Sequence, residues 1–199
     1  MQGIISLRIQ NKENTMSLNS TPSGERTHIG IFGRRNAGKS SLINALTSQS
    51  LAIVSEQKGT TTDPVYKAME LLPLGPVMLI DTPGNDDEGE LGALRIEKSN
   101  QVLHKCDIAL LVVDATTGIS EEDKLLWQKI TERKLPALLV LNKTEALSEM
   151  QQALTAMAAL KLTKHCFLVS TKTQRNIKEL KEAIAALRPR EAERQLLGD

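Results

Sequence analysis

The chain has 199 residues, and its 25 Lys and Arg residues nearly balance its 24 Asp and Glu residues, which leaves a formal charge of +1. This length suits a single domain, and a chain so close to neutral has no overall field that would draw it to nucleic acid or to an anionic membrane. The two cysteines, Cys106 and Cys166, lie in or beside apolar runs, which predicts free, buried thiols in a reducing compartment, the cytoplasm, and excludes a disulfide-stabilised scaffold.

Short apolar runs alternate with stretches of helical period along the chain. The runs that predict strands are residues 28–32, 65–72, 77–81, 108–114, 137–142 and 166–170. The stretches that predict helices are residues 40–48, 92–105, 121–134, 148–160 and 176–187. This alternation is typical of an α/β fold with three layers, in which helices cover both faces of a mostly parallel sheet.

One link departs from that pattern. The run at 65–72 is followed almost at once by the run at 77–81, whereas a parallel crossover needs about a dozen residues or more. These two runs predict an antiparallel hairpin, so the expected sheet has six strands, one of which is antiparallel. The apolar runs are far shorter than the roughly 20 residues that cross a bilayer, so we expect no membrane partner.

The two ends of the chain are polar. We expect residues 1–24 to form a flexible extension and residues 25–188 to form the one domain. The charged segment 189–199, which opens with a proline, is expected to be a linker or the start of a further domain.

Residues 33–40 read GRRNAGKS and fit the phosphate-binding pattern G-x-x-x-x-G-K-S, between a predicted strand and a predicted helix. The glycines let successive N–H groups turn toward phosphate oxygens, and the helix N-terminus adds a favourable dipole. Lys39 would reach the outer phosphates, and the Ser40 hydroxyl would bind Mg2+. The predicted nucleotide-binding residues of this loop are Gly33, Asn36, Ala37, Gly38, Lys39, Ser40 and Ser41. The alternative is a strand-to-helix turn without a ligand.

Three further segments follow at the ends of predicted strands. Asp81 and Gly84 form a D-x-x-G pattern, in which the carboxylate can hold Mg2+ and the glycine N–H can contact a γ-phosphate. Residues 142–145 read NKTE, and residues 170–172 read STK. Because ligands bind at the carboxyl edge of doubly wound sheets, we expect all four segments to meet there.

These four segments, in this order, resemble the motifs of the phosphate-loop GTPases. The resemblance implies a Ras-like fold, GTP and GDP as ligands, and Mg2+ as a cofactor. It also implies that guanine is bound by Asn142 and Lys143 together with Ser170, Thr171 and Lys172.

Glu145 is the one departure from the family's guanine motif, because an aspartate usually stands there. Glu145 carries the same charge on a longer side chain. Loss of part of a buried bidentate contact costs on the order of 1 to 3 kcal/mol, so the selectivity for guanine depends on how well the glutamate reaches. We still expect guanine, with Glu145 as a nucleotide-binding residue.

Residues 59–61 read GTT and resemble the first switch of the TrmE/Era-like subgroup, which acts in tRNA modification, ribosome assembly and hydrogenase maturation. The resemblance implies that Thr61 binds Mg2+ only while the γ-phosphate is present. It further implies that Asn36 binds K+, which would neutralise charge developing between the β- and γ-phosphates. The alternatives are an ordinary loop at 59–61 and a simple turn residue at Asn36. The predicted catalytic residues are Lys39, Thr61, Gly84 and Asn36.

No glutamine follows Gly84 to orient the attacking water. The acidic candidates for that role are Asp86, Asp87, Glu88 and Glu90, and the sequence does not choose among them. We expect slow hydrolysis of GTP to GDP and phosphate, stimulated by K+.

Residues 24–188 look most like the N-terminal GTPase domain of HydF, the maturation GTPase of FeFe hydrogenase. The features that carry this resemblance are GRR at 33–35, TTTDPVYKAMELLPLGPV at 60–77 and DDEGELGALR at 86–95. Relatives that act on tRNA or ribosomes usually have proline in place of Arg35 and TTRD at 60–63. The resemblance implies hydrogenase maturases and the hydrogenase apoprotein as partners. HydF carries an iron–sulfur cluster in another domain, and two scattered cysteines cannot supply its ligands, so we expect no cluster in this chain.

Three functions compete at this point. The leading one is a GTP-hydrolysing switch in the maturation of FeFe hydrogenase. The second is a GTPase of ribosome assembly or tRNA modification, which would call for an RNA-binding module that the near-zero charge does not favour. The third is a non-hydrolysing guanine-nucleotide-binding module. A second copy of the chain is also a candidate partner, whereas nucleic acid is not expected.

Overall fold

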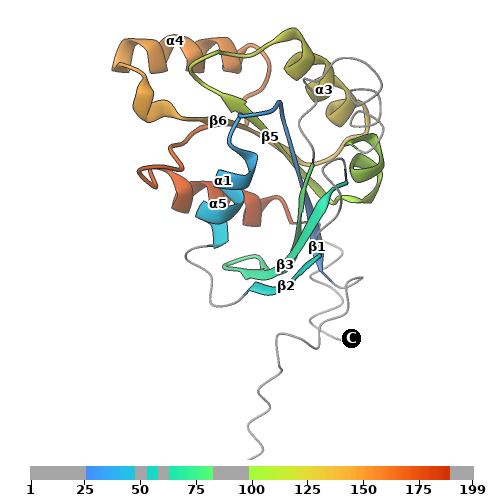
Figure 1. The fold of residues 1–199 in the computed structure, drawn as a ribbon. Coiled ribbons are helices and arrows are strands. Elements are labelled where there is room, and N and C mark those ends of the chain that lie inside the picture. Colours follow the sequence, from blue (N-terminus) through green and yellow to red (C-terminus); the bar gives the residue numbers. More distant parts are fainter. Residues whose placement is uncertain (1–25, 48–52, 58–62, 83–98, 189–199) are drawn as a thin grey trace, which may run out of the picture.

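The computed structural model describes residues 26–47, 53–57, 63–82 and 99–188 (Figure 1). Its strands are β1 (Thr27–Phe32), β2 (Ile53–Gln57), β3 (Val65–Leu71), β4 (Gly75–Asp81), β5 (Ile108–Asp114), β6 (Ala137–Asn142) and β7 (Cys166–Leu168). Its helices are α1 (Lys39–Thr47), α3 (Glu121–Glu132), α4 (Glu149–Leu160), α5 (Ile177–Ala186) and the short 3-10 turn η3 (Thr144–Ala146). Residues 99–105 are also helical.

The strands form one seven-stranded sheet in the order β2-β3-β4-β1-β5-β6-β7. The strands β4, β1, β5, β6 and β7 pair in parallel, while β3 runs antiparallel to both of its neighbours. The expected α/β fold with a mostly parallel sheet and one antiparallel strand is confirmed. The sheet has one strand more than the six predicted, because β2 reads IVSEQ and shows neither an apolar run nor a regular alternation that would predict a strand.

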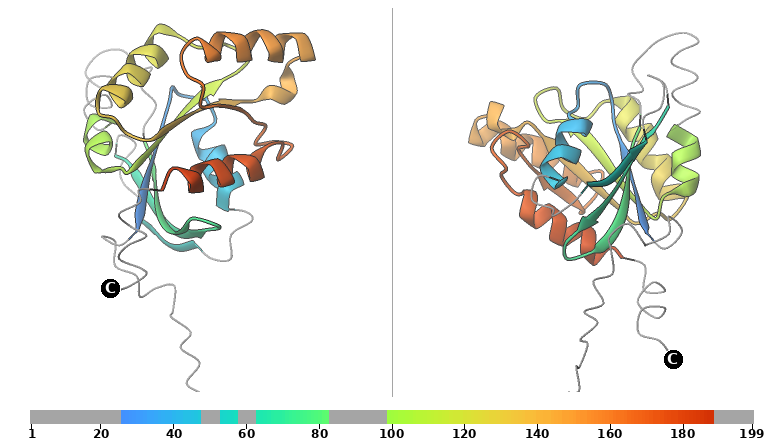
Figure 2. Two further views of the ribbon diagram at one scale, coloured as in Figure 1. Left: turned by 180° about the vertical axis from the view of Figure 1, so that it is seen from behind. Right: turned by 60° about the horizontal axis from the view of Figure 1, so that its bottom comes forward.

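Helices cover both faces of the sheet, as the alternating sequence pattern predicts (Figures 1 and 2). On one face, α1 and α5 pack side chains such as Leu42 and Leu180 into the first hydrophobic core. On the other face, the helical residues 99–105 and α3 pack Leu103, Trp127 and Ile130 into the second core. The central strand β5 is buried along almost its whole length because it contributes to both cores.

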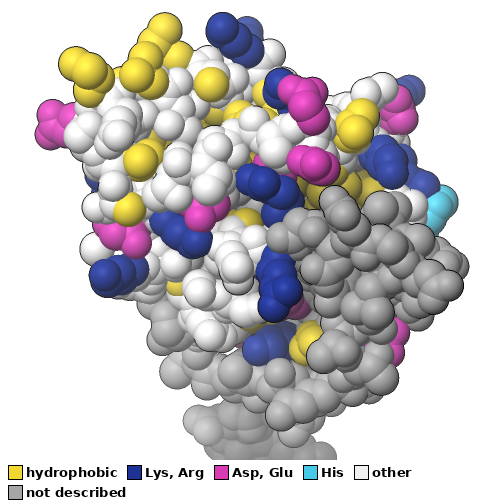
Figure 3. All heavy atoms as spheres, turned by 45° about the horizontal axis from the view of Figure 1, so that its top comes forward, with side chains coloured by type: hydrophobic (Ala, Val, Ile, Leu, Met, Phe, Trp, Pro, Cys, Tyr) yellow, Lys and Arg dark blue, Asp and Glu magenta, His cyan; other side chains and the backbone are white. Residues whose placement is uncertain are grey.

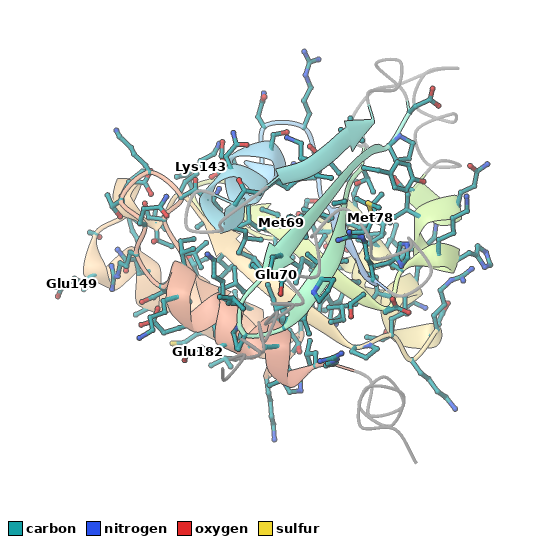
Figure 4. The ribbon with its side chains drawn as sticks, turned by 90° about the horizontal axis from the view of Figure 1, so that it is seen from below. Met69, Glu70, Met78, Lys143, Glu149 and Glu182 are labelled. Carbon is teal, nitrogen blue, oxygen red and sulfur yellow. The ribbon has the colours of Figure 1, made fainter. Side chains whose placement is uncertain are left out.

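The side chains of the hairpin formed by β3 and β4 pack into both hydrophobic cores. Met69 on β3 is fully buried in the first core, whereas Met78 on β4 packs against the second core. Their strands are neighbours, with Met69 opposite Val77 and Ala68 opposite Met78. Figure 4 labels both methionines on these strands. Successive side chains of a strand point to opposite faces of the sheet, so the hairpin contributes side chains to the core on each face.

Two helices on the second face begin at capping boxes of the same form. At α3, the Asp123 backbone N–H donates to Ser120 Oγ at 3.2 Å, and the Ser120 N–H donates to Asp123 Oδ2 at 2.9 Å. Ser148 and Gln151 repeat the arrangement at α4. These reciprocal bonds satisfy backbone donors that a helix start otherwise leaves without partners, and so fix where each helix begins.

The outer face of α4 exposes large apolar side chains at helical spacing. Met150, Leu154, Met157 and Leu160 are between 57% and 76% exposed. Figure 3 shows hydrophobic side chains gathered over α4, at the upper left of that view. Among the residues that the structure describes, no helix has the length and apolar character needed to span a bilayer.

Candidate functional site

The predicted site segments lie together at the carboxyl edge of the sheet. The phosphate-binding loop follows β1, Asp81 ends β4, Asn142 ends β6, and Ser170 follows β7. Parallel pairing aligns these ends, because β1 lies beside β4 with Ile31 opposite Asp81. The predicted meeting of the four segments is therefore what the fold produces for the described residues.

Backbone conformation explains the two glycines of the phosphate-binding loop. Gly33 has a φ of +139° and Gly38 a φ of +95°, a region that other residues rarely adopt. A Cβ on Gly33 would lie 2.1 Å from the Val112 carbonyl oxygen, and one on Gly38 would lie 2.2 Å from Asn142 Nδ2. Asn36 is also left-handed, with a φ of 61°, which suits asparagine better than most side chains. The loop thus depends on these residue types for its shape.

Lys39 is buried beneath this loop. Its Nζ donates hydrogen bonds to the carbonyl oxygens of Gly33 at 2.8 Å and Arg34 at 2.9 Å. The side chain is therefore held on the inner side of the loop, at the first residue of α1. This position brings a positive charge to the concave side, where phosphate oxygens would bind.

Ser40 on α1 and Asp81 at the end of β4 are joined by a hydrogen bond at the position predicted for a metal ion. Ser40 Oγ donates to Asp81 Oδ2 at 2.8 Å, while Asp81 Oδ1 is buried without a hydrogen-bond partner among the residues that the structure describes. The pKa of the Asp81 carboxyl lies above its ordinary value. Burial raises it, and this effect outweighs the lowering by the Ser40 hydrogen bond and by the charges of Lys39 and Lys67. A hydroxyl and a carboxylate with an unpartnered oxygen are the hard oxygen ligands that Mg2+ prefers, so these residues fit the predicted ion.

Asn142 joins the phosphate-binding loop to the loop after β7. Its side chain is 1% exposed. Its Nδ2 donates to the Ala37 carbonyl oxygen at 3.2 Å, and its Oδ1 accepts from the Thr171 backbone N–H at 3.2 Å. Both ends of the amide are used, so three predicted site segments are tied together by one side chain.

The remaining residues predicted to bind guanine surround Asn142. Lys143 has a φ of 66°, and its Nζ donates to Asp114 Oδ2 at 2.6 Å. Glu145 is an exposed residue of the turn η3. Ser170 is fully buried, and its Oγ accepts from the Thr173 N–H at 3.0 Å. These contacts shape the loops, whereas Glu145 and Lys172 are exposed side chains.

A small hollow of about 120 Å3 lies beside the phosphate-binding loop. Its lining includes Asn36, Asp114, Thr117 and Asp123. No sequence pattern assigns a role to Asp114, Thr117 or Asp123. A carboxylate at the end of a central strand, on the ligand-binding edge, was the signal that could have drawn attention to Asp114.

Several predicted residues lie outside the described part of the chain. They are the predicted first switch at 59–61, which includes Thr61, together with Gly84 and the acidic candidates Asp86, Asp87, Glu88 and Glu90. Ser41 itself lies on α1, exposed, directly after Ser40. Within the ranges that are described, no group of three or more His, Cys, Asp or Glu side chains could hold a metal ion. Cys106 and Cys166 are free thiols, and burial raises the pKa of each to about 11.

The family follows from a match over more than half of the chain. Residues 28–143 match the model of the 50S ribosome-binding GTPases. The chain belongs to this family. It therefore has a GTPase domain, with the phosphate-binding loop, Asp81 and the Asn142-Lys143 pair all inside the matched region.

The curated relatives of this GTPase include tRNA modification GTPases named MnmE, two of which illustrate the match. That of Synechococcus elongatus is 35% identical over 159 residues, which cover 79% of this chain and 34% of the relative. That of Helicobacter pylori strain J99 is 42% identical over 118 residues, which cover 59% of this chain and 25% of the relative. The chain spans about a third or less of the length of these curated relatives.

Solved structures agree with this assignment. A variant of Aquifex aeolicus Era bound to GDP and AlF4- superposes with a TM-score of 0.69 at 26% identity, covering 81% of this chain and 56% of Era. Era bound to MgGDPNP and a segment of 16S ribosomal RNA gives a TM-score of 0.68, covering 82% and 57%. The TrmE/Era type of GTPase is thereby supported, while the resemblance to HydF stays a prediction.

Proposed function

We propose that this GTPase domain works as a nucleotide-dependent switch that hydrolyses GTP slowly and is stimulated by K+. The observation that carries this proposal is the double hydrogen bond of Asn142, to Ala37 of the phosphate-binding loop and to Thr171 of the loop after β7. A ligand that touches both loops would be a nucleotide, with its phosphates at one end and its base at the other.

The chain's own residues would bind and orient the two ends of GTP. Lys39 and the backbone N–H groups of the glycine-rich loop would hold the β- and γ-phosphates. Ser40 and Asp81 would hold Mg2+, which supplies positive charge to the phosphate oxygens when bound. Catalysis of this kind relies on positioning and on charge stabilisation rather than on a covalent step, which suits a site rich in backbone donors.

Guanine would lie against the segments after β6 and β7. Asn142 fixes these segments, and Lys143 and Glu145 extend from the first of them. The loop at 170–172 would contribute backbone N–H groups beside the base. Glu145 would accept hydrogen bonds from the guanine ring N–H and its amine, in the place that an aspartate usually takes.

For the pathway, the curated relatives favour a role in tRNA modification, because both MnmE proteins described above carry that name. A specific feature of the sequence favours a second candidate, the maturation of FeFe hydrogenase. Arg35 and the TTTD run at 60–63 match the HydF pattern rather than that of the GTPases acting on tRNA. The two candidates share the same nucleotide chemistry and differ in partner.

A binding and turnover experiment tests the nucleotide function. Wild type is expected to bind fluorescent GDP in Mg2+ and to release phosphate from GTP, while K39A loses binding and keeps its fold by circular dichroism. K164A is the matched control, because Lys164 is an exposed lysine near the start of β7, on the edge opposite to the site. Equal affinity for ATP and GTP would refute the guanine assignment, and binding without phosphate release would identify a non-hydrolysing module.

A second experiment separates the two pathways. The GTP hydrolysis rate is measured with bulk tRNA and with FeFe-hydrogenase apoprotein added in turn. Stimulation by tRNA alone would support the tRNA-modification role, and stimulation by the apoprotein alone would support hydrogenase maturation.

A further inference from the structure

Asp114, the last residue of β5, accepts three hydrogen bonds through its two carboxylate oxygens. Oδ2 accepts from Lys143 Nζ at 2.6 Å, and Oδ1 accepts from the Thr116 backbone N–H at 2.9 Å and from Thr116 Oγ1 at 2.6 Å. The carboxylate is therefore held from both sides. Thr116 fixes its direction, and Lys143 is the partner toward which it points.

The ion pair is shielded enough to be a stable contact. The side chain of Asp114 is 15% exposed and that of Lys143 is 35% exposed. Burial alone raises the pKa of Asp114, but the hydrogen bonds from Lys143 and Thr116 outweigh it and hold the pKa below its ordinary value. Charge-assisted bonds of this length are among the stronger polar contacts in proteins.

Strand pairing brings the two residues together. Asp114 lies opposite Asn142 in the parallel pair of β5 and β6, so the residue after Asn142 starts beside Asp114. Lys143 then turns through a left-handed backbone conformation, and its flexible side chain reaches the carboxylate. Without an anchor, a lysine side chain samples many rotamers, and ordering it is a cost of any contact that it makes with a ligand.

The turn that begins at Asp114 also contacts the phosphate-binding loop. Arg34 Nη2 donates to Thr117 Oγ1 at 3.1 Å, and Arg34 Nε lies 3.6 Å from Asp123 Oδ2. Asp114 and Thr117 line the small hollow that also contacts Asn36. Residues 114–117 thus touch both the loop expected to bind phosphates and the lysine expected to contact the nucleoside.

From these contacts we propose that Asp114 is a positioning residue, which fixes the Lys143 side chain beside the phosphate-binding loop before the nucleotide arrives. This inference rests on the proposed role of Lys143 in guanine-nucleotide binding. An anchored lysine acts on the nucleoside end, which GTP and GDP share and which does not change as the γ-phosphoryl is transferred. Asp114 therefore contributes to binding of ground state and transition state alike.

The test is a double-mutant cycle with D114N, K143A and D114N/K143A. Asn at 114 retains an acceptor for Thr116 and removes the charge that holds Lys143. We expect D114N to raise the Kd for GDP and the KM for GTP about tenfold. The value of kcat should not change, because the lost contact stabilises the ground state and the transition state equally. In the K143A background, D114N should have no further effect.

D107N is the matched control, because Asp107 precedes the other end of β5 and pairs with His28 away from the site. It is expected to leave Kd and KM unchanged, and thermal unfolding shows whether each variant keeps its fold. Equal losses from D114N with and without Lys143 would overturn the positioning role. An unchanged Kd in K143A would instead overturn the proposed role of Lys143, while the K39A experiment still tests nucleotide binding itself.

Discussion

Ser40 and Asp81, 41 residues apart in the chain, are joined by a hydrogen bond of 2.8 Å, and the second carboxylate oxygen is buried with no partner in the described part of the chain. A buried carboxylate oxygen without a hydrogen bond is costly in a folded protein. A cation between this pair and a phosphate group would remove that cost. If Ser40 and Asp81 bind Mg2+ as proposed, this carboxylate would lower the stability of the protein without ligand and raise its affinity for Mg2+ with the nucleotide.

The first prediction concerns D81N. This substitution removes the buried negative charge, so without metal and nucleotide the variant should be more stable by about 1 kcal/mol, seen as a rise of roughly 2 to 4 °C in Tm. In the presence of Mg2+, the same variant should bind GTP at least about tenfold more weakly than wild type. Titrations with and without EDTA measure the second effect. An unchanged EDTA response in D81N would show that Asp81 does not contribute to metal binding.

The second prediction separates the side chain of Asn36 from its backbone. K+ should accelerate hydrolysis relative to Na+ at equal ionic strength, because the Asn36 side-chain oxygen would help to hold the larger cation. N36G keeps the left-handed backbone and removes this oxygen, so it should lose the K+ effect with little change in GDP affinity. N36A adds a backbone penalty of about 1 to 2 kcal/mol at φ 61°. Equal wild-type rates in KCl and NaCl would leave Asn36 as a turn residue.

The third prediction is that E145D binds GDP more tightly than wild type. Glu145 is an exposed residue of the short turn η3, and the shorter aspartate is what guanine sites of this family usually carry. Competition with ADP is the sensitive readout, because the proposed contact would distinguish the guanine ring from adenine. We expect the preference for GDP over ADP to rise by about tenfold or less, in line with one improved charge-assisted bond. Weaker binding by E145D would mean that the loop is adapted to glutamate.

The fourth prediction compares alanine at three glycines with positive φ. G118A meets no atom within 4 Å and should cost only the backbone penalty of about 1 to 2 kcal/mol. G33A places Cβ 2.1 Å from the Val112 carbonyl oxygen, so it should cost more than about 3 kcal/mol. G38A displaces the Asn142 side chain, which should abolish nucleotide binding while destabilising less than G33A. Urea unfolding and GDP titration measure the two effects, and equal unfolding costs for G33A and G118A would contradict the clash.

Much of the site could be predicted from the sequence because its residues belong to short segments at strand ends. The residues from Gly33 to Ser40 are contiguous, and the positions of Asp81 and Asn142 follow from the apolar runs before them. Parallel strands bring such ends to one edge, so the meeting of these segments follows from the alternation of strands and helices.

The supporting contacts could not be predicted in the same way. Arg34 and Thr117 are 83 residues apart, and Lys143 and Asp114 are 29 residues apart, so no local pattern links them. Their pairing depends on register in the sheet and on the turn after β5. The edge strand β2 could not be predicted for a related reason. Its short sequence carries no strand pattern, and the strand is defined by its backbone pairing with β3.

The position of Asn142 has a consequence for ligands that resemble only part of a nucleotide. Its amide contacts the carbonyl of Ala37 with one end and the N–H of Thr171 with the other. A pyrophosphate that orders the phosphate-binding loop would also order the loop beside the base, and guanosine would do the reverse. Each fragment should therefore improve the affinity of the other, a positive coupling that isothermal titration of one fragment in the presence of the other can measure.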